Sequence, residues 1–144
     1  MEIIPGIGTD KVHFGITEAE AVSILGSPDK TYKTDEGCRR LQFNLLRIEL
    51  SFEPENEYRL GWIEVHDPKL LLGGRKILGA TQKEVLEFVT ELLGEQPEIE
   101  DYGSFLSASY DEHWVELQFQ FGSLCCVNFG VLYDDLDSPK WPSS

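Results

Sequence analysis

The residues that could carry chemistry in this chain are three histidines, three cysteines and 26 carboxylates. His13, His66 and His113 lie far apart, and none has a histidine or cysteine at a spacing typical of metal sites. We therefore expect each histidine to be a turn or surface residue. Cys125 and Cys126 are adjacent in a strand-like segment, so their side chains should point to opposite faces and cannot easily share a metal ion. One of them is expected to be a core thiol.

The motifs for phosphate binding and for nucleophilic catalysis are incomplete. Gly6-x-Gly8 lacks the third glycine of a dinucleotide fingerprint, because Lys11 stands at that position. The run Gly-Gly-Arg-Lys at 73–76 lacks P-loop spacing and is typical of a turn. The chain contains no G-x-S-x-G elbow. The sequence therefore predicts no catalytic, cofactor-binding or metal-binding residues, and a protein that is not an enzyme.

Carboxylates are concentrated in the second half of the chain. The formal net charge is −14: residues 1–83 hold 13 acids and 11 bases, whereas residues 84–144 hold 13 acids and one base, Lys140. This balance disfavours nucleic acid and anionic membranes as partners. It favours a rapid encounter with a basic protein. Solubility alone is the alternative explanation of the charge.

The acidic face of a helix that begins near Thr81 is the clearest candidate for a partner-binding surface. Its carboxylates follow one another at helical spacing, opposite the apolar stripe, and more acids follow in the next loop. Near the C-terminus, three aspartates precede a tryptophan, a combination that suits an interface hot spot or, alternatively, a tail packed on the core. The predicted partner-binding residues are Glu84, Glu87, Glu91, Glu95, Glu98, Glu100 and Asp101, followed by Asp134, Asp135, Asp137 and Trp141.

The length of 144 residues indicates one domain with a core of its own. The first residues lack the basic and apolar regions of a signal peptide, and no apolar run is long enough to span a membrane. Three cysteines without C-x-x-C spacing suit free thiols in a reducing compartment. We therefore expect a cytoplasmic protein.

Two helices are predicted from a T-x-x-E start that recurs sixty-four residues later. Thr17 and Thr81 are N-cap residues, and Gly26 and Gly94 end the two helices. Each helix precedes three strand-like segments with alternating apolar residues. These segments are 39–46, 48–52 and 60–65, then 105–110, 114–121 and 124–132.

The repeated pattern predicts an α+β fold built from a tandem pseudo-repeat of a helix plus antiparallel strands. One sheet with both helices on one face is expected. The single domain 1–144 would comprise unit 1 at about 3–66, unit 2 at about 67–132 and an irregular acidic tail at 133–144.

This double unit resembles the tandem-repeat architecture of β-lactamase inhibitor protein and its structural relatives. The phrases Ile4-Pro5-Gly6-Ile7-Gly8, Phe14-Gly15-Ile16-Thr17 and Ile24-Leu25-Gly26-Ser27-Pro28 also look like small bacterial immunity proteins found beside polymorphic toxins. The resemblance covers residues 3–132 and rests on caps, turns and core positions, so it transfers no functional residues. The chain departs from the inhibitor in lacking a secretory segment and paired cysteines.

The resulting hypothesis is a non-enzymatic immunity protein whose acidic surface neutralises a basic toxin, such as a nuclease. The free protein is expected to be a monomer. Two alternatives stay open from the sequence. One is a small-ligand-binding or enzymatic domain with a cleft at the junction of the units. The other is a homo-oligomeric structural protein that associates through a strand edge.

Overall fold

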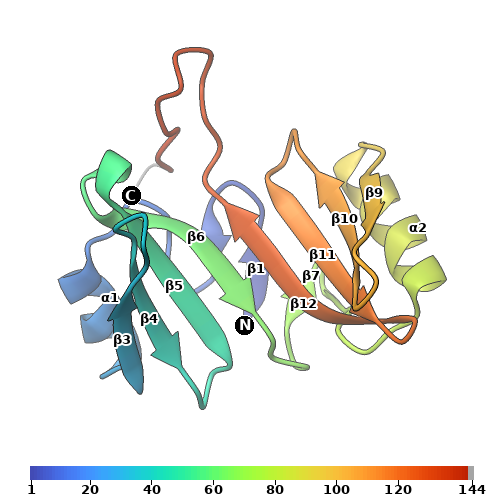
Figure 1. The fold of residues 1–144 in the computed structure, drawn as a ribbon, viewed down its shortest axis with the longest axis horizontal. Coiled ribbons are helices and arrows are strands. Elements are labelled where there is room, and N and C mark those ends of the chain that lie inside the picture. The colour runs from blue at the N-terminus through green and yellow to red at the C-terminus, as the bar shows by residue number, and fades with distance from the viewer. Residues whose placement is uncertain (143–144) are drawn as a thin grey trace.

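An eight-stranded antiparallel sheet forms the centre of the protein, in a computed structural model that describes residues 1–142 (Figure 1). Its first four strands are β3 (Lys30–Lys33), β4 (Arg39–Phe43), β5 (Ile48–Glu53) and β6 (Arg59–Val65). The other four are β9 (Glu98–Asp101), β10 (Leu106–Tyr110), β11 (Val115–Gln120) and β12 (Ser123–Gly130). The order is β3-β4-β5-β6-β12-β11-β10-β9, so two four-stranded meanders meet where β6 pairs with β12.

The two meanders repeat one backbone pattern. Leu60 exchanges hydrogen bonds with Gly15 and Ile16, ahead of the first helix. Leu124 makes the same two bonds with residues 79–80, ahead of the second. All of these positions are related by the shift of sixty-four residues seen in the sequence. The register shift between β5 and β6 also recurs between β11 and β12. The repeat is therefore a repeat of hydrogen bonds as well as of sequence.

The helices begin at the predicted threonine caps. The side chain of Thr17 accepts a bond from the Glu20 N–H, and the Glu20 carboxylate accepts one from the Thr17 N–H, which completes a capping box for α1 (Glu18–Leu25). Thr81 caps α2 (Gln82–Leu93) through the Glu84 N–H. Of the two helices, α2 buries two valines, whereas α1 buries one alanine.

A second, four-stranded sheet corrects the prediction of a single sheet. It consists of β1 (Glu2–Ile4), β2 (Gly8–Thr9), β7 (Leu71–Leu72) and β8 (Arg75–Lys76), in the order β2-β1-β7-β8. The strands are two or three residues long, and β1 pairs in parallel with β7 from the other unit. Runs this short show no alternation, and a pairing so distant in sequence leaves no local signal. The α+β class and the mainly antiparallel pairing are confirmed.

Each unit also has one strand more than predicted. The additional strands, β3 and β9, lie at the two edges of the large sheet and are mostly exposed. An exposed edge strand needs no apolar face, so its sequence lacks the alternating pattern that marks the inner strands. A short 3-10 helix, η1 (Pro54–Asn56), makes the β5–β6 connection longer than the β11–β12 turn.

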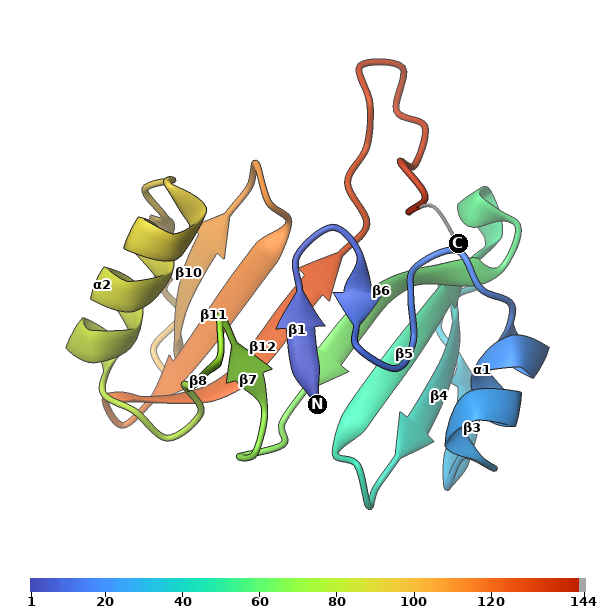
Figure 2. The same ribbon diagram turned by 180° about the vertical axis from the view of Figure 1, so that it is seen from behind.

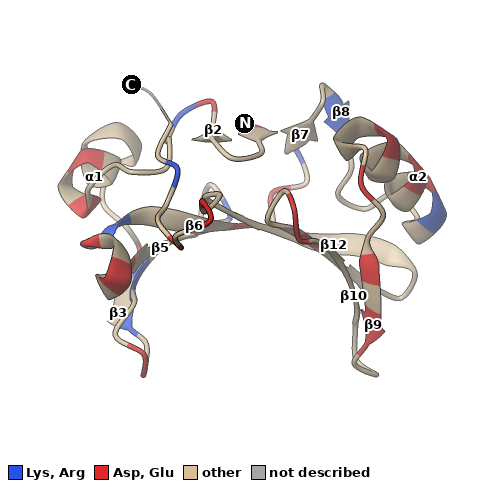
Figure 3. Cartoon of the chain, turned by 90° about the horizontal axis from the view of Figure 1, so that it is seen from above, with Lys and Arg blue, Asp and Glu red and all other residues tan. Residues whose placement is uncertain are grey.

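The large sheet arches, and the helices and the small sheet all lie over its convex side (Figure 3). The buried residues of the core gather on this side, with Leu50, Ile63, Leu117 and Phe129 fully enclosed. The opposite side of the sheet, which we call the open face, faces the viewer in Figure 1, and no other helix or strand of residues 1–142 covers it (Figures 1 and 3); Figure 2 shows the covered side. No helix among residues 1–142 is both long and apolar enough to cross a membrane.

Candidate functional site

The acidic helix α2 presents three of its four predicted carboxylates to solvent. Glu84, Glu87 and Glu91 are exposed, and none takes part in an ion pair among the described residues. The fourth carboxylate has a different role. Glu95 accepts hydrogen bonds from His113 Nδ1 at 2.8 Å and from the Glu112 N–H at 3.0 Å.

Glu95 therefore ties the end of α2 to the β10–β11 turn. Its side chain is only 11% exposed. Burial raises the pKa of Glu95, but the hydrogen bonds from His113 and Glu112 outweigh burial and leave the pKa below its usual value. A carboxylate with two internal partners is a structural group, so it is a poor candidate for contact with another protein.

The predicted acids of β9 are divided between the two sides of the sheet. Glu98 and Glu100 lie opposite Ser109 and Ser107 in the register, on the open face. Asp101 points the other way and accepts a bond from the Gly103 N–H, in a local turn. Two of the three acids are thus available on the open face.

The predicted cluster near the C-terminus is mainly structural. Asp134 accepts bonds from the Leu136 and Ser138 N–H groups and closes a turn. Trp141 packs against the core, where a Cβ added to Gly15 would lie 3.2 Å from its ring. The tryptophan is therefore not an exposed hot spot, and within residues 1–142 the exposed carboxylates of this cluster without a side-chain hydrogen bond are those of Asp135 and Asp137. Residues 143–144 lie outside the described part of the chain.

The structure does not unite the predicted acids into one surface. The segment that carries Asp135 and Asp137 projects between the two units, whereas α2 lies at the far flank of unit 2 (Figure 1). Glu98 and Glu100 face the opposite side of the sheet from α2 (Figure 3). Three separate acidic surfaces result, and a single partner of ordinary size cannot be assumed to cover all of them.

The open face adds acidic residues that sequence reasoning missed. In unit 1, Glu49 on β5 accepts bonds from Tyr32 at 2.7 Å and from Arg40 at 3.2 Å. The Arg40 guanidinium neutralises this carboxylate within the sheet. Lys30 lies two strands from Glu49 on the same face, with Gln42 between them in the register. Glu64 lies opposite Glu49 and bonds His66. Unit 1 thus carries basic residues as well as acids on its open face.

At the matching place unit 2 holds a carboxylate that has no ion-pair partner among residues 1–142. Glu116 on β11 accepts bonds from Ser107 at 2.7 Å, Gln118 at 3.1 Å and Asn128 at 3.1 Å. Ser107 occupies the place that Arg40 fills in unit 1, one strand away from the carboxylate in both registers. Neutral donors hold Glu116 in position but leave its charge uncompensated.

An aromatic residue lies at the seam between the units. Trp62 on β6 is opposite Gly130 on β12, and a Cβ on that glycine would lie 2.5 Å from the indole ring. The ring therefore packs closely on Gly130 on the open face and is partly exposed. Ser51 is its other neighbour in the register. The open face combines a tryptophan at its centre with carboxylates on the unit 2 side.

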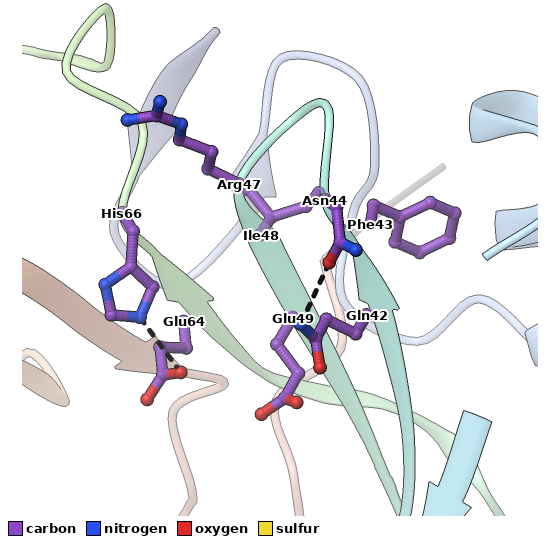
Figure 4. Close-up of a pocket in the computed structure, with 8 residues that line it drawn as sticks. All are labelled: Gln42, Phe43, Asn44, Arg47, Ile48, Glu49, Glu64 and His66. Carbon is purple, nitrogen blue, oxygen red and sulfur yellow. Dashed lines mark hydrogen bonds and ion pairs between the residues drawn. The ribbon is translucent and has the colours of Figure 1, made fainter. Parts of the chain in front are cut away.

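A small pocket of about 270 Å³ lies next to the seam, lined by β4, β5, their connecting turn and the end of β6 (Figure 4). Its polar lining includes Glu49, Glu64, His66 and Arg47. Glu64 Oε2 lies 3.1 Å from His66 Nε2. The hydrogen bond raises the pKa of His66 and lowers that of Glu64, against the opposing effect of burial on each.

Cys126, from unit 2, lies beside this pair. Its Sγ is 3.7 Å from His66 Nε2, and the residue is 2% exposed. Burial raises the pKa of the thiol, as do the nearby carboxylates of Glu64 and Glu116. The core thiol expected from the sequence is thus Cys126. Its neighbours escaped prediction because β6 and β12 are sixty residues apart, although the Glu64-x-His66 spacing places both side chains on one strand face.

Comparison with known proteins shows the fold without a family. No protein-family model matches the sequence, and no curated protein matches it. An extracellular protein containing an SCP domain, from Bacillus anthracis str. Ames, has a similar structure, with a TM-score of 0.55 and 11% identity over 81% of this chain. This chain spans 43% of the length of that protein. YjgB, a DUF4309 family protein from Bacillus subtilis subsp. subtilis str. 168, has a TM-score of 0.54 and 16% identity over 88% of each chain.

Proposed function

We propose that this protein is a non-enzymatic binding protein that neutralises a basic protein, most specifically a toxin such as a nuclease. The observation that carries the proposal is the uncompensated acid on the unit 2 side of the open face. Glu98, Glu100 and Glu116 lie there, and none has an ion-pair partner among residues 1–142. A nuclease must be basic around its phosphate-binding site, so such a surface complements it in charge.

Two further features support the open face as the interface. The arched sheet offers a curved surface that no other element covers (Figure 3). At its centre, Trp62 is partly exposed and packs closely on Gly130, so little side-chain freedom is lost on binding. A fixed aromatic residue is the kind of group from which interface hot spots are built, and here it shares one face with the acids of unit 2. The acidic face of α2 then serves long-range attraction more than contact.

The cytoplasm is the compartment that we propose for this activity. Cys38, Cys125 and Cys126 are all unpaired. Free thiols are typical of a reducing environment. In such a compartment an immunity protein would meet its toxin inside the cell that it protects.

The first experiment is capture of the tagged protein's partners from its native host at low and moderate salt, with identification by mass spectrometry. We expect one stoichiometric basic protein whose recovery falls with salt, and inhibition of its activity by the purified protein. The affinity is then measured for two matched charge reversals, Glu98→Lys with Glu100→Lys on the open face, and Glu84→Lys with Glu87→Lys on α2.

The two variants carry the same change in net charge on different surfaces. The open-face variant should weaken binding more than about tenfold, and the helix variant much less, mainly through the association rate. Equal effects would show that only net charge matters. The absence of a basic partner at either salt concentration would contradict the proposal.

A second candidate function, a small-ligand-binding or enzymatic domain, is favoured by the pocket at Glu49, Glu64 and His66. The pocket contains the paired carboxylates and the histidine that acid–base chemistry requires. Its volume of about 270 Å³ suits a small polar ligand. A fragment screen by NMR that shifts the signals around His66 would favour this function over protein binding.

A further inference from the structure

Three side chains of different chemistry converge beside the seam of the two units. Glu64 and His66 lie at the end of β6, and Cys126 lies on the adjacent strand β12. A carboxylate oxygen, an imidazole nitrogen and a thiol sulfur from these residues all lie within 4.8 Å of one another. Each unit is thus incomplete without the other at this place, since unit 1 supplies two of the side chains and unit 2 supplies one.

The contacts converge on a single nitrogen atom. His66 Nε2 lies 3.1 Å from Glu64 Oε2 and 3.7 Å from Cys126 Sγ. In a nucleophilic triad the carboxylate and the nucleophile bond opposite nitrogens of the imidazole, so that the ring can pass a proton between them. This arrangement does not allow that relay, and the sulfur is buried. Convergence of three donor atoms on one point is instead the arrangement that a metal ion requires.

We propose that Glu64, His66 and Cys126 form a zinc site that joins the two units. In a tetrahedral site with Zn–N and Zn–O of about 2.1 Å and Zn–S of about 2.3 Å, neighbouring nitrogen and oxygen ligands are about 3.4 Å apart, and nitrogen and sulfur about 3.6 Å. The separations of 3.1 Å and 3.7 Å lie close to these values. A mixed set of sulfur, nitrogen and oxygen ligands suits Zn²⁺ better than Mg²⁺ or Ca²⁺.

The surroundings of the cluster also suit a metal ion. Asn128 Nδ2 lies 3.7 Å from Cys126 Sγ and bonds Glu116 at 3.1 Å, which holds the amide beside the sulfur. Such outer contacts orient the ligands of metal sites. Glu64 and His66 line the pocket of Figure 4, so a fourth position faces that pocket and is available to water or to a small ligand. On binding, Zn²⁺ replaces the thiol proton of Cys126, which passes to solvent.

The test uses Co²⁺ as a spectroscopic substitute for Zn²⁺ in the full-length protein after treatment with a chelator. Co²⁺ bound to a thiolate gives an intense charge-transfer band in the near ultraviolet, and displacement by Zn²⁺ removes it. We expect one Co²⁺ per chain, with this band. Cys126→Ser should abolish the band, and His66→Ala should weaken Zn²⁺ binding more than about tenfold.

The adjacent cysteine and the neighbouring carboxylate provide matched controls. Cys125→Ser changes a thiol one residue away and should keep the band and the affinity. Glu49→Gln removes a carboxylate that lies in the same pocket but already accepts hydrogen bonds from Tyr32 and Arg40. This variant should leave the band in place. His66 is exposed, so His66→Ala should fold even if Cys126→Ser does not. Absence of the band in the unmodified protein, or a band that needs Cys125, would overturn the zinc site.

Discussion

The two units share a backbone plan but use their open faces differently. Both have a threonine-capped helix, a four-stranded meander and a register shift at the same place in the repeat. On the open face, unit 1 pairs the Glu49 carboxylate with Arg40, whereas unit 2 holds Glu116 with neutral donors. Unit 1 therefore sets a cation against this carboxylate on its open face, whereas unit 2 leaves the equivalent carboxylate without one.

This difference between the open faces separates the residues that determine the fold from those that we propose for binding. The capping threonines, the glycines that end the helices and the backbone bonds of Leu60 and Leu124 recur in the two units, because each unit must build the same layer on the same sheet. The open-face residues support no other layer, so they are free to differ between the units. The two units meet at the seam between β6 and β12, where the large Trp62 lies opposite Gly130, which has no side chain.

The largest effect on stability is expected at this seam. Gly130→Ala would place a Cβ 2.5 Å from the Trp62 ring and 3.1 Å from the Gly61 carbonyl. The backbone of Gly130 is not in the left-handed region, so the cost is steric and amounts to about 3 kcal/mol of unfolding free energy. Chemical denaturation of the variant measures this loss.

The control for this substitution is the same change in a Trp62→Ala background. Removal of the indole also removes the clash, so Gly130→Ala should then cost less than about 1 kcal/mol. Equal costs in both backgrounds would show that the carbonyl of Gly61, and not the tryptophan, requires glycine. The close packing of the ring on Gly130 would then not be the reason for glycine at this position.

The second prediction concerns the two helices, which bury different residues at equivalent places. Val85 on α2 and Ala21 on α1 are both buried and differ by the repeat of sixty-four residues. Val85→Ala gives unit 2 the residue of unit 1 and should cost about 2 kcal/mol, from the lost apolar burial and the cavity. Val22→Ala, at a half-buried position, should cost less than about 1 kcal/mol. Thermal unfolding of both variants measures the two losses.

Much of the fold could be predicted because its signals are local. The capping threonines, the glycines that end the helices and the alternation in β11 each lie within a few residues of the structure that they determine. The small sheet and the edge strands β3 and β9 could not be predicted in the same way. The small sheet depends on pairing between residues about seventy positions apart. The edge strands bury too little surface to need an apolar pattern.

The candidate site was harder to predict, for a related reason. The acidity of unit 2 was visible in composition, but its division among α2, the open face and the C-terminal turn depends on strand register. Glu95 and Trp141 carried the residue types of an interface and proved to be internal contacts. Glu116 and Trp62 became candidates only when the register placed them on one face.

The third prediction compares how a carboxylate anchors the helix of each unit at acid pH. Hydrogen bonds from Arg39 lower the pKa of Glu18, the first residue of α1. Burial raises the pKa of Glu95, just after α2, but the hydrogen bonds from His113 and Glu112 outweigh burial and leave that pKa lowered. A lowered folded-state pKa gives stability that is complete above the pKa of an unfolded glutamate, about 4.3, and is lost as the pH falls through the folded-state value.

Glu95→Gln should therefore reduce stability at neutral pH by about 1 kcal/mol and flatten the loss of stability on the acid side of that range. Glu18→Gln should have a smaller effect, a few tenths of a kcal/mol, because the side chains of Arg39 and Glu18 are 40% and 32% exposed and solvent screens their charges. Urea unfolding at a series of pH values measures both. A larger effect of Glu18 would mean that the first helix depends on its ion pair more than burial indicates.

The smallest expected difference lies in the helix caps, where the two units come closest to equivalence. Thr17→Ala and Thr81→Ala should each cost about 1 kcal/mol. Only the first cap has the reciprocal bond, from the Thr17 N–H to Glu20. Glu20→Ala should therefore cost about 0.5 kcal/mol through this bond, whereas Glu84→Ala, at the same position of α2, should leave the unfolding free energy nearly unchanged. If Glu84→Ala cost as much as Glu20→Ala, the second helix would also form a full capping box in solution, and the two helix caps would be equivalent in energy as well as in position.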